Sequence, residues 1–355
     1  MQKDHIRPLT GLRWIAALFV YLSHTVGDNN LPSSLLQFTE NGYNGVTIFF
    51  VLSAFILTVN YHASLNLRGG VALRYLTARA ARILPIYYIV LVFVLLQTKL
   101  TGGEFPGWSW KHLLLIQVWD TDIGISMGLN GPAWSIGVEV FFYLIFPFLL
   151  MLSSKMLRKL GLSLVLTVIG IGLISFFYFT FRNGSVNVGD SNSTHRWLYR
   201  SPLTRIGDFV YGMGLAGIYL SAPKSRPTQK IASYLTYASF ALILLMMYIT
   251  IPRTAISWDL QYAIPAGILI LGLAVNRTSY LAQFLSSKVL VQLGEISFTF
   301  YLIHKVLPFD NYLKNTSAFA IVYYLLNIAI LCAISYSLHQ FVEKPSRRFL
   351  NSRFR

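Results

Sequence analysis

The sequence has few charged residues and almost no cysteine. Only 12% of its 355 residues are Asp, Glu, Lys or Arg, whereas 55% are hydrophobic; soluble domains carry about 25% charged residues. A soluble core cannot absorb this many apolar side chains, but a bilayer can. The single cysteine, Cys332, excludes an internal disulfide and a cysteine-based zinc site. We predict an all-α integral membrane protein, one polytopic domain over residues 1–355 with no fused soluble domain.

Acidic residues are also scarce. The chain has 13 Asp and Glu against 29 Lys and Arg, a net charge of +16. Such an excess is typical of proteins that bind nucleic-acid phosphates. Here, however, most basic residues lie in alternate segments between apolar runs, as expected for cytoplasmic loops. The charge therefore predicts membrane topology, with membrane lipid as a partner and no nucleic acid.

Apolar runs of roughly 17–25 residues are long enough to cross a bilayer. The first follows Lys3 and Arg7 as in a signal peptide, but Arg13 and His24 interrupt it and no cleavage site follows, so we interpret it as a retained helix. An even number of spans puts both termini on the basic, cytoplasmic side. We expect about ten transmembrane helices, near 11–27, 44–62, 83–100, 133–153, 161–181, 204–221, 232–251, 259–276, 289–305 and 318–341.

Two of these runs are interrupted. The run 204–221 is short and rich in glycine, and the run 259–276 contains Pro265. Neighbouring helices must satisfy the backbone groups that such interruptions free. We therefore expect these two helices in the interior of the bundle.

Ionisable groups within membrane spans are candidates for function because burying them is costly. Arg13 and His24 are eleven residues apart, which places them on one helix face about 16 Å apart along the axis. Asp28, four residues after His24, could orient its imidazole. His24 is then either a general base or a histidine hydrogen-bonded within the bundle.

The fourth run begins at a proline and carries a buried acid. Ser135 and Glu139 are spaced i,i+4 after Pro132, so they share a face one turn inside the membrane. A carboxylate there needs a partner or takes up a proton. Glu139 could pair with His24 and tune it as a base, and the residues leave open whether Asp28 or Glu139 does so.

Two further groups of polar residues lie before the third run and within the ninth. Arg79 and Arg82 precede the third run, either as ordinary positive-inside anchors or as a clamp for phosphate groups. Ser297, Tyr301 and His304 share one stripe of the ninth run, which by itself indicates an amphipathic packing face.

Six motifs in order resemble the membrane acyltransferase-3 family. Arg13 and His24 are similar to its Arg-x10-His, and Arg79 and Arg82 to its Arg-x-x-Arg. The runs Phe-Phe-Val-Leu-Ser-Ala-Phe (49–55), Trp-Ser-Ile-Gly-Val-Glu (134–139), Gly-Glu-Ile-Ser-Phe-Thr-Phe-Tyr-Leu-Ile-His (294–304) and Phe-Val-Glu-Lys-Pro (341–345) resemble its other motifs. Ala54 and Phe298 replace a glycine and a tyrosine of the family pattern.

The resemblance implies an acyl-CoA-dependent O-acyltransferase, foremost an O-acetyltransferase. Acyl-CoA, in particular acetyl-CoA, would be the donor substrate, with no permanently bound cofactor and no metal. Arg13, Arg79 and Arg82 would bind the donor, His24 would be the general base with Glu139 or Asp28, and Ser135, Tyr301 and His304 would contact substrate. The acceptor would be a hydroxyl of a cell-surface glycan, such as lipopolysaccharide or exopolysaccharide, and the location a bacterial inner membrane.

A transporter or flippase for a polar or lipid-linked substrate is the main alternative. Polar residues that line a path through ten helices would serve translocation as well as catalysis. Consumption of acyl-CoA distinguishes the two. A covalent acyl group on Ser135 is a lesser alternative, because no obvious base accompanies it.

Overall fold

The computed structural model describes residues 6–25, 33–65, 70–223, 225–307 and 320–353. Apart from one isolated bridge between Ser185 and Ser193, the secondary structure of these residues is helical. The long helices are α1 (Arg7–Thr25), α3 (Gly45–Tyr61), α4 (Val71–Leu100), α7 (Trp134–Ser153), α8 (Leu160–Phe181), α9 (Ile206–Ser221), α10 (Arg226–Ile249), α11 (Leu260–Val275), α13 (Lys288–Ile303) and α14 (Ala320–Leu338). The shorter ones are α2 (Ser33–Glu40), α5 (Ser109–Leu113), α6 (Ile123–Ser126), α12 (Tyr280–Leu285) and α15 (Lys344–Arg353).

Each of the ten predicted spans overlaps one of the long helices. Among the described residues, six helical stretches are long and apolar enough to cross a membrane by length and composition: 35–61, 71–100, 131–153, 160–181, 226–249 and 324–349. Helix α11 is apolar but shorter. The protein is therefore an all-helical membrane protein, whereas the number of ten crossings and the side of the termini stay predictions.

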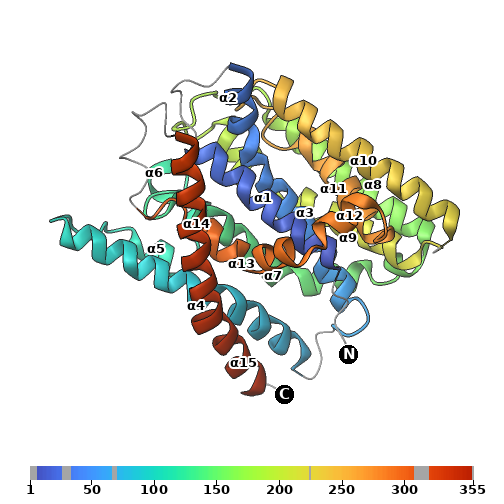
Figure 1. Ribbon diagram of the computed structural model, residues 1–355, viewed down its shortest axis with the longest axis horizontal. Helices are drawn as coiled ribbons and strands as arrows, with labels where there is room; N and C mark the ends of the chain where they lie inside the picture. Colours follow the sequence, from blue (N-terminus) through green and yellow to red (C-terminus); the bar gives the residue numbers. More distant parts are fainter. Residues whose placement is uncertain (1–5, 26–32, 66–69, 224, 308–319, 354–355) are drawn as a thin grey trace.

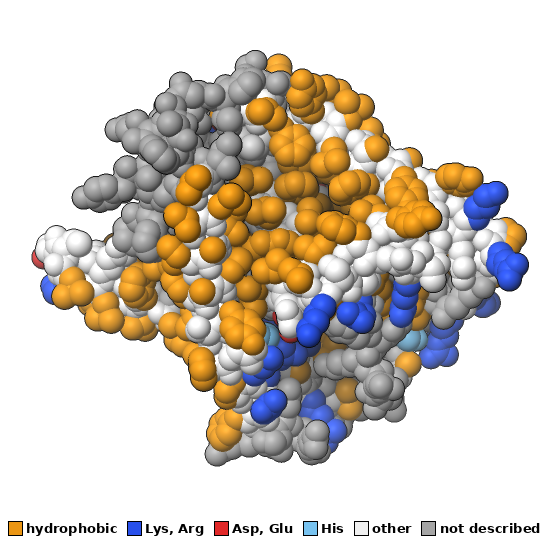
Figure 2. Space-filling model, viewed as in Figure 1, with side chains coloured by type: hydrophobic (Ala, Val, Ile, Leu, Met, Phe, Trp, Pro, Cys, Tyr) orange, Lys and Arg blue, Asp and Glu red, His pale blue; other side chains and the backbone are white. Residues whose placement is uncertain are grey.

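The helices form a buried centre and an apolar outer surface. Helices α4, α8 and α10 expose most of the side chains in their apolar stretches, as side chains that face lipid would be. Figure 2 shows apolar side chains across the face of α14 and its neighbours, with Lys and Arg gathered toward one edge. Helices α1 and α3 lie inside, side by side (Figure 1).

The prediction that α9 and α11 are interior helices is confirmed. Most side chains of both are buried. Glycine permits the close approach of α9 to α3, because a Cβ at Gly212 would lie 2.4 Å from the carbonyl oxygen of Val51. At the α1–α13 contact a Cβ at Gly294 would lie 1.9 Å from the carbonyl oxygen of Thr10. These backbones touch only because the side chain is a hydrogen.

A buried ion network joins α3, α9 and the start of α11. The guanidinium of Arg205 is fully buried, donates to Asp208 at 3.0 Å and forms an ion pair with Asp259. The hydroxyl of Thr47 donates to Asp259 at 3.2 Å. Asp208 is completely buried, and its arginine partner removes the need to reach water.

Candidate active site

Two connected cavities lie within the helices, and the larger one lies where the first turns of α1 meet α3, α4 and the C-terminal helices. Its volume is about 300 Å³, the lower end of the range for small-molecule sites. Because the start of α1 and the start of α15 line it together, both reach the same side of the molecule. Its walls consist of Ile6, Leu9, Thr10, Arg13, Ile56, Leu57, Asn60, Tyr61, Arg79, Arg82, Glu295, His339, Glu343, Lys344 and Arg347.

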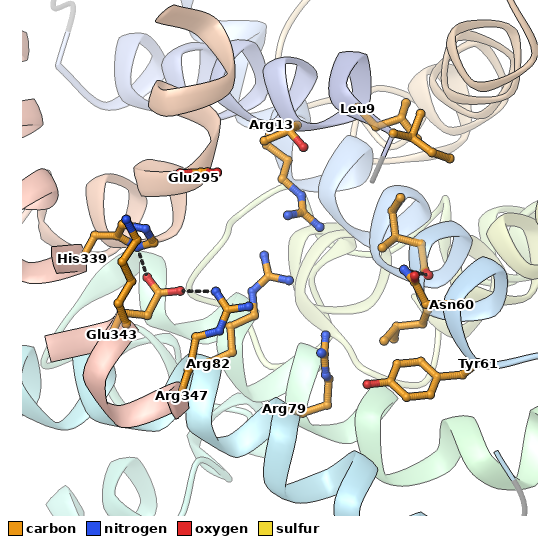
Figure 3. Close-up of a pocket in the computed structure, with 15 residues that line it drawn as sticks. Leu9, Arg13, Asn60, Tyr61, Arg79, Arg82, Glu295, His339, Glu343 and Arg347 are labelled. Atoms are coloured by element: carbon orange, nitrogen blue, oxygen red, sulfur yellow. Dashed lines mark hydrogen bonds and ion pairs between the residues drawn. The ribbon is translucent and has the colours of Figure 1, made fainter. Parts of the chain in front are cut away.

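Three arginines predicted from the sequence converge on this cavity. Arg13 comes from α1, and Arg79 and Arg82 come from successive turns of α4; Figure 3 shows their guanidinium groups turned into the same space. Among the described residues, no carboxylate forms an ion pair with any of the three. Half-buried guanidinium groups without counter-ions form a site for an anion.

Aromatic rings support one of these arginines. The guanidinium carbon of Arg79 lies 5.8 Å from the ring centre of Tyr61 and 5.9 Å from that of Tyr143. Such cation–π contacts stabilise a guanidinium without using its hydrogen-bond donors. The donors of Arg79 therefore stay available to a ligand. The sequence had not identified either tyrosine as part of the site.

The opposite wall comes from the end of the chain. A π-helical turn, His339–Glu343, leads into α15. The buried Glu343 accepts from Nδ1 of His339 at 2.8 Å and pairs with Arg347 at 3.4 Å (Figure 3). The resemblance of residues 341–345 to a family motif marked this segment, but it did not indicate that Arg347 lines the cavity.

A second cavity of about 60 Å³ continues inward from the first. Arg13 and Arg82 line both cavities, so they lie at the junction. Beyond them the walls are mainly apolar and aromatic, and Ser135, Glu139 and Tyr301 are three of the polar members. The remaining lining residues are Val46, Phe49, Phe50, Ser53, Ile83, Ile136, Ser297 and Phe298. The interior path therefore begins at cations and continues through a narrow apolar passage.

Ser135 and Tyr301, both predicted substrate contacts, meet in the lining of this passage. Their hydroxyl oxygens are 2.8 Å apart. Both oxygens also lie 3.0 Å from the carbonyl oxygen of Pro132, so one hydroxyl donates to that carbonyl while the other donates to its neighbour. No carboxylate or imidazole is hydrogen-bonded to Ser135 among the described residues. The arrangement orients two hydroxyl groups and gives the serine no base that would make it a nucleophile.

Glu139 lies in the passage but is not brought to His24. Its carboxylate accepts from the hydroxyl of Ser53 at 3.3 Å and from that of Tyr143, one turn further along α7. No hydrogen bond or ion pair joins Glu139 to His24 within the described residues. The i,i+4 spacing with Tyr143 satisfies the acid within its own helix, a choice that the sequence analysis did not consider.

His24 pairs instead with His304, the last residue of the predicted stripe on α13. Nδ1 of His24 is 2.8 Å from Nε2 of His304, and the two rings are nearly parallel, at 9°. Nδ1 of His304 is 2.6 Å from the carbonyl oxygen of Tyr301. The second proposed partner of His24, Asp28, lies outside the described residues.

The carbonyl oxygen of Tyr301 determines which nitrogen atoms of the two histidines donate and which accept. A carbonyl oxygen only accepts, so Nδ1 of His304 must carry a proton. In a neutral His304, Nε2 is then an acceptor, and Nδ1 of His24 must donate to it. Nε2 of a neutral His24 consequently carries a lone pair and no proton, as a general base requires.

Helix α1 separates the two ends of the site. It is a single α-helix from Arg7 to Thr25, so Arg13 at the cavity junction and His24 at the histidine pair are about 16 Å apart along its axis. The structure thus brings Arg13, Arg79 and Arg82 together at one end. It brings His24 and His304 together at the other, with Glu139, Ser135 and Tyr301 between them.

Comparison with known proteins agrees with this arrangement. A family model described as an acyltransferase domain matches residues 7–339. The chain is 29% identical over 371 residues to an acyltransferase, MdmB, of Streptomyces mycarofaciens, covering 97% of this chain and 92% of that protein. It is 24% identical to a putative O-acetyltransferase of Staphylococcus aureus strain COL and 24% identical to the peptidoglycan O-acetyltransferase OatA of Listeria monocytogenes.

Coverage differs between these relatives. Alignments cover 97% and 98% of this chain but only 58% of the staphylococcal protein and 57% of the listerial one. The chain therefore spans little more than half the length of those two relatives. No solved structure matches the chain.

Proposed function

The chain belongs to the acyltransferase domain family that its residues 7–339 match, and from this premise we propose that it is an acyl-CoA-dependent O-acyltransferase. It would move an acetyl group from cytoplasmic acetyl-CoA to a hydroxyl of a cell-surface glycan or its lipid-linked precursor, in a bacterial inner membrane. One observation carries the proposal. Arginines that form no ion pair among the described residues lie at the mouth of a mainly apolar passage, and Tyr301, which lines that passage, holds His304 and through it His24.

The donor would enter from the side of the arginines. Arg13, Arg79 and Arg82 would bind the phosphates of CoA, since guanidinium groups bind phosphate bidentately. The pantetheine arm would extend through the apolar passage past Glu139 toward His24. The separation of about 16 Å between Arg13 and His24 agrees with the length of such an arm. Glu139 would balance the charge of Arg13 and Arg82 at the junction.

Transfer would occur in one displacement. Nε2 of His24 would take the proton of the acceptor hydroxyl, whose oxygen would attack the thioester carbon. The carbon–sulfur bond would break, and the imidazolium of His24 would give its proton to the departing CoA thiolate, which restores the neutral base. Ser135 and Tyr301 would hydrogen-bond the thioester or the acceptor rather than carry the acyl group, because Ser135 has no base.

The relatives suggest a class of acceptor rather than one molecule. One relative is named as a peptidoglycan O-acetyltransferase, so peptidoglycan fragments belong in a panel with lipid-linked glycans and free sugars. Those relatives contain sequence that this chain does not cover. Their acceptors are therefore starting points for the panel.

The proposal is tested by CoA release from acetyl-CoA, with purified protein in nanodiscs and the acceptor panel. We expect acceptor-dependent release by the wild type and a loss of about a hundredfold or more in His24→Ala, because the general base is removed. Arg82→Ala should raise the KM for acetyl-CoA. His62→Ala is the matched control, since His62 contacts a carbonyl of its own helix and lines neither cavity.

The outcomes separate the alternatives. Full activity of a folded His24→Ala protein would exclude His24 as the base. Absence of both CoA release and acetyl-CoA binding in the wild type would exclude the donor and favour a transporter.

A further inference from the structure

The larger cavity, which is the outer one of the two, is lined by more cationic side chains than the three predicted arginines. Lys344 and Arg347, one turn apart on α15, also line this cavity. The cavity therefore has five guanidinium or ammonium groups in its lining and two carboxylates, those of Glu295 and Glu343. A single phosphate group does not require so many cations.

The five cations fall into two groups by position. Arg13 and Arg82 lie at the junction with the inner passage, and Arg79 is one turn of α4 before Arg82. Lys344 and Arg347 line the outer cavity but not the inner passage. An anion bound by the first group is adjacent to the passage, whereas an anion bound by the second is further from it.

The C-terminal group is held in place for binding. The π-helical turn His339–Glu343 precedes it, and π-helical turns occur frequently at functional sites. Lys344 donates to Gln340 at 3.0 Å, and Glu343 is anchored by His339 at 2.8 Å. The Arg347–Glu343 pair is long, at 3.4 Å, and the Arg347 side chain is 46% exposed. Glu343 is buried and also held by His339, so Arg347 can turn its exposed guanidinium toward a phosphate without leaving the carboxylate unpaired.

We propose that Lys344 and Arg347 bind the 3′-phosphate of the adenosine portion of CoA, and that this contact lets the protein select CoA thioesters over donors without that group. The inference rests on the proposed function, because it takes CoA as the donor. In CoA the diphosphate is attached directly to the pantetheine arm, so it belongs at Arg13 and Arg82. The 3′-phosphate is at the far end, where α15 lies. A phosphate monoester carries about two negative charges at neutral pH, which suits a separate pair of cations.

The test compares the binding of CoA and 3′-dephospho-CoA, by calorimetry on the full-length protein in nanodiscs. We expect the wild type to bind CoA about tenfold or more tightly than 3′-dephospho-CoA, as loss of a charge-assisted contact implies. In Arg347→Ala and Lys344→Ala, CoA affinity should fall while 3′-dephospho-CoA affinity stays the same. Arg82→Ala should weaken both ligands equally, because both carry the diphosphate.

Arg348→Ala is the matched control. Arg348 lies on the same helix with the same charge, is exposed and does not line the cavity, so the variant should keep the wild-type preference. Arg347→Lys should retain part of the preference, because it keeps the charge but not the bidentate geometry.

The failure of this inference differs from failure of the proposed function. Equal binding of both ligands by the wild type would overturn the inference and leave the donor intact. An equal loss of both ligands in Arg347→Ala would overturn it too. Binding of neither ligand by the wild type would contradict the proposed function itself.

Discussion

At the scale of single residues, the site depends on which nitrogen atoms carry protons. The hydrogen-bond chain begins at the carbonyl oxygen of Tyr301, passes through His304 and ends at His24. In serine hydrolases a carboxylate holds the catalytic histidine in its tautomer. Here a neutral imidazole, itself held by a backbone carbonyl, takes the same position. His304 is therefore a positioning residue in this proposal, and the sequence analysis had expected it to contact substrate.

The first prediction concerns this positioning residue. His304→Leu removes the acceptor for Nδ1 of His24, so the imidazole is free to adopt the other tautomer. We expect kcat to fall about a hundredfold, as general-base catalysis contributes at least that much. The KM for acetyl-CoA should not change, because His304 lines neither cavity.

His304→Gln is the matching conservative variant. Its amide can donate to the carbonyl of Tyr301 and accept from His24, so it should recover a large part of kcat. Nitrogen NMR of labelled His24 should show one tautomer in the wild type and the Gln variant, and a mixture in the Leu variant. An unchanged tautomer and unchanged kcat in His304→Leu would exclude the positioning role.

At the scale of elements, contact between α1 and α13 holds the histidine pair together. His24 is on α1 and His304 directly follows α13, and the separation of the helices is limited by Gly294 against the backbone of Thr10. At the next residue of α1, a Cβ at Gly11 would lie 2.0 Å from the carbonyl oxygen of Leu285, the last residue of α12. Helix α1 is therefore fixed by backbone contacts on two faces, which gives His24 a defined place.

The second prediction tests this close packing. Gly294→Ala places a methyl group 1.9 Å from the Thr10 carbonyl, so α13 must move away from α1. We expect destabilisation of about 1–3 kcal/mol, the usual cost of overpacking, measured as a lower midpoint of thermal unfolding in detergent. CoA release should fall as well, because the displacement separates His304 from His24.

Gly172→Ala is the control for that experiment. Gly172 is in the middle of α8, and nothing lies within 4 Å of its Cβ position. This variant should be as stable as the wild type or slightly more stable, since alanine favours the helix. Equal stability of Gly294→Ala and Gly172→Ala would contradict the packing described for α1 and α13.

At the scale of the whole molecule, the distribution of basic side chains and the position of the larger cavity indicate the same side. The larger cavity is lined by the beginning of α1 and by α15, and basic side chains gather toward one edge of the molecule (Figure 2). From the positive-inside rule we predict that this edge is cytoplasmic, the side on which a CoA donor would be found. The buried Arg205–Asp208–Asp259 network lies among other elements and does not line either of these cavities.

The third prediction is the resulting topology. Cys332→Ser gives a background without cysteine, into which single cysteines can be introduced at Arg348 in α15 or Asn187 in the exposed segment after α8. In intact cells, a membrane-impermeant maleimide should label Asn187→Cys and not Arg348→Cys. In inverted vesicles, the pattern should reverse. Labelling of both from the same side would contradict an even number of crossings with cytoplasmic termini.

The sequence by itself determined the class of the protein and the places of its helices. Composition alone required a membrane protein, because only a bilayer can accommodate so many apolar side chains. Helical spacing placed Arg13 and His24 on one face of the first helix, and Ser135 and Glu139 on one face of the fourth, since each pair lies within one helix. The motifs identified the family, and they also named every arginine at the cavity junction.

Tertiary structure alone decided the partners. His24 meets His304 across 280 positions of sequence, and Arg205 binds Asp259 although they lie on different elements. Spacing along one helix says which side chains share a face, but not which helix faces them. That depends on how closely backbones approach at positions such as Gly294 and Gly212. For the same reason, the sequence assigned Glu139 to His24, whereas packing placed Glu139 beside Tyr143 and Ser53.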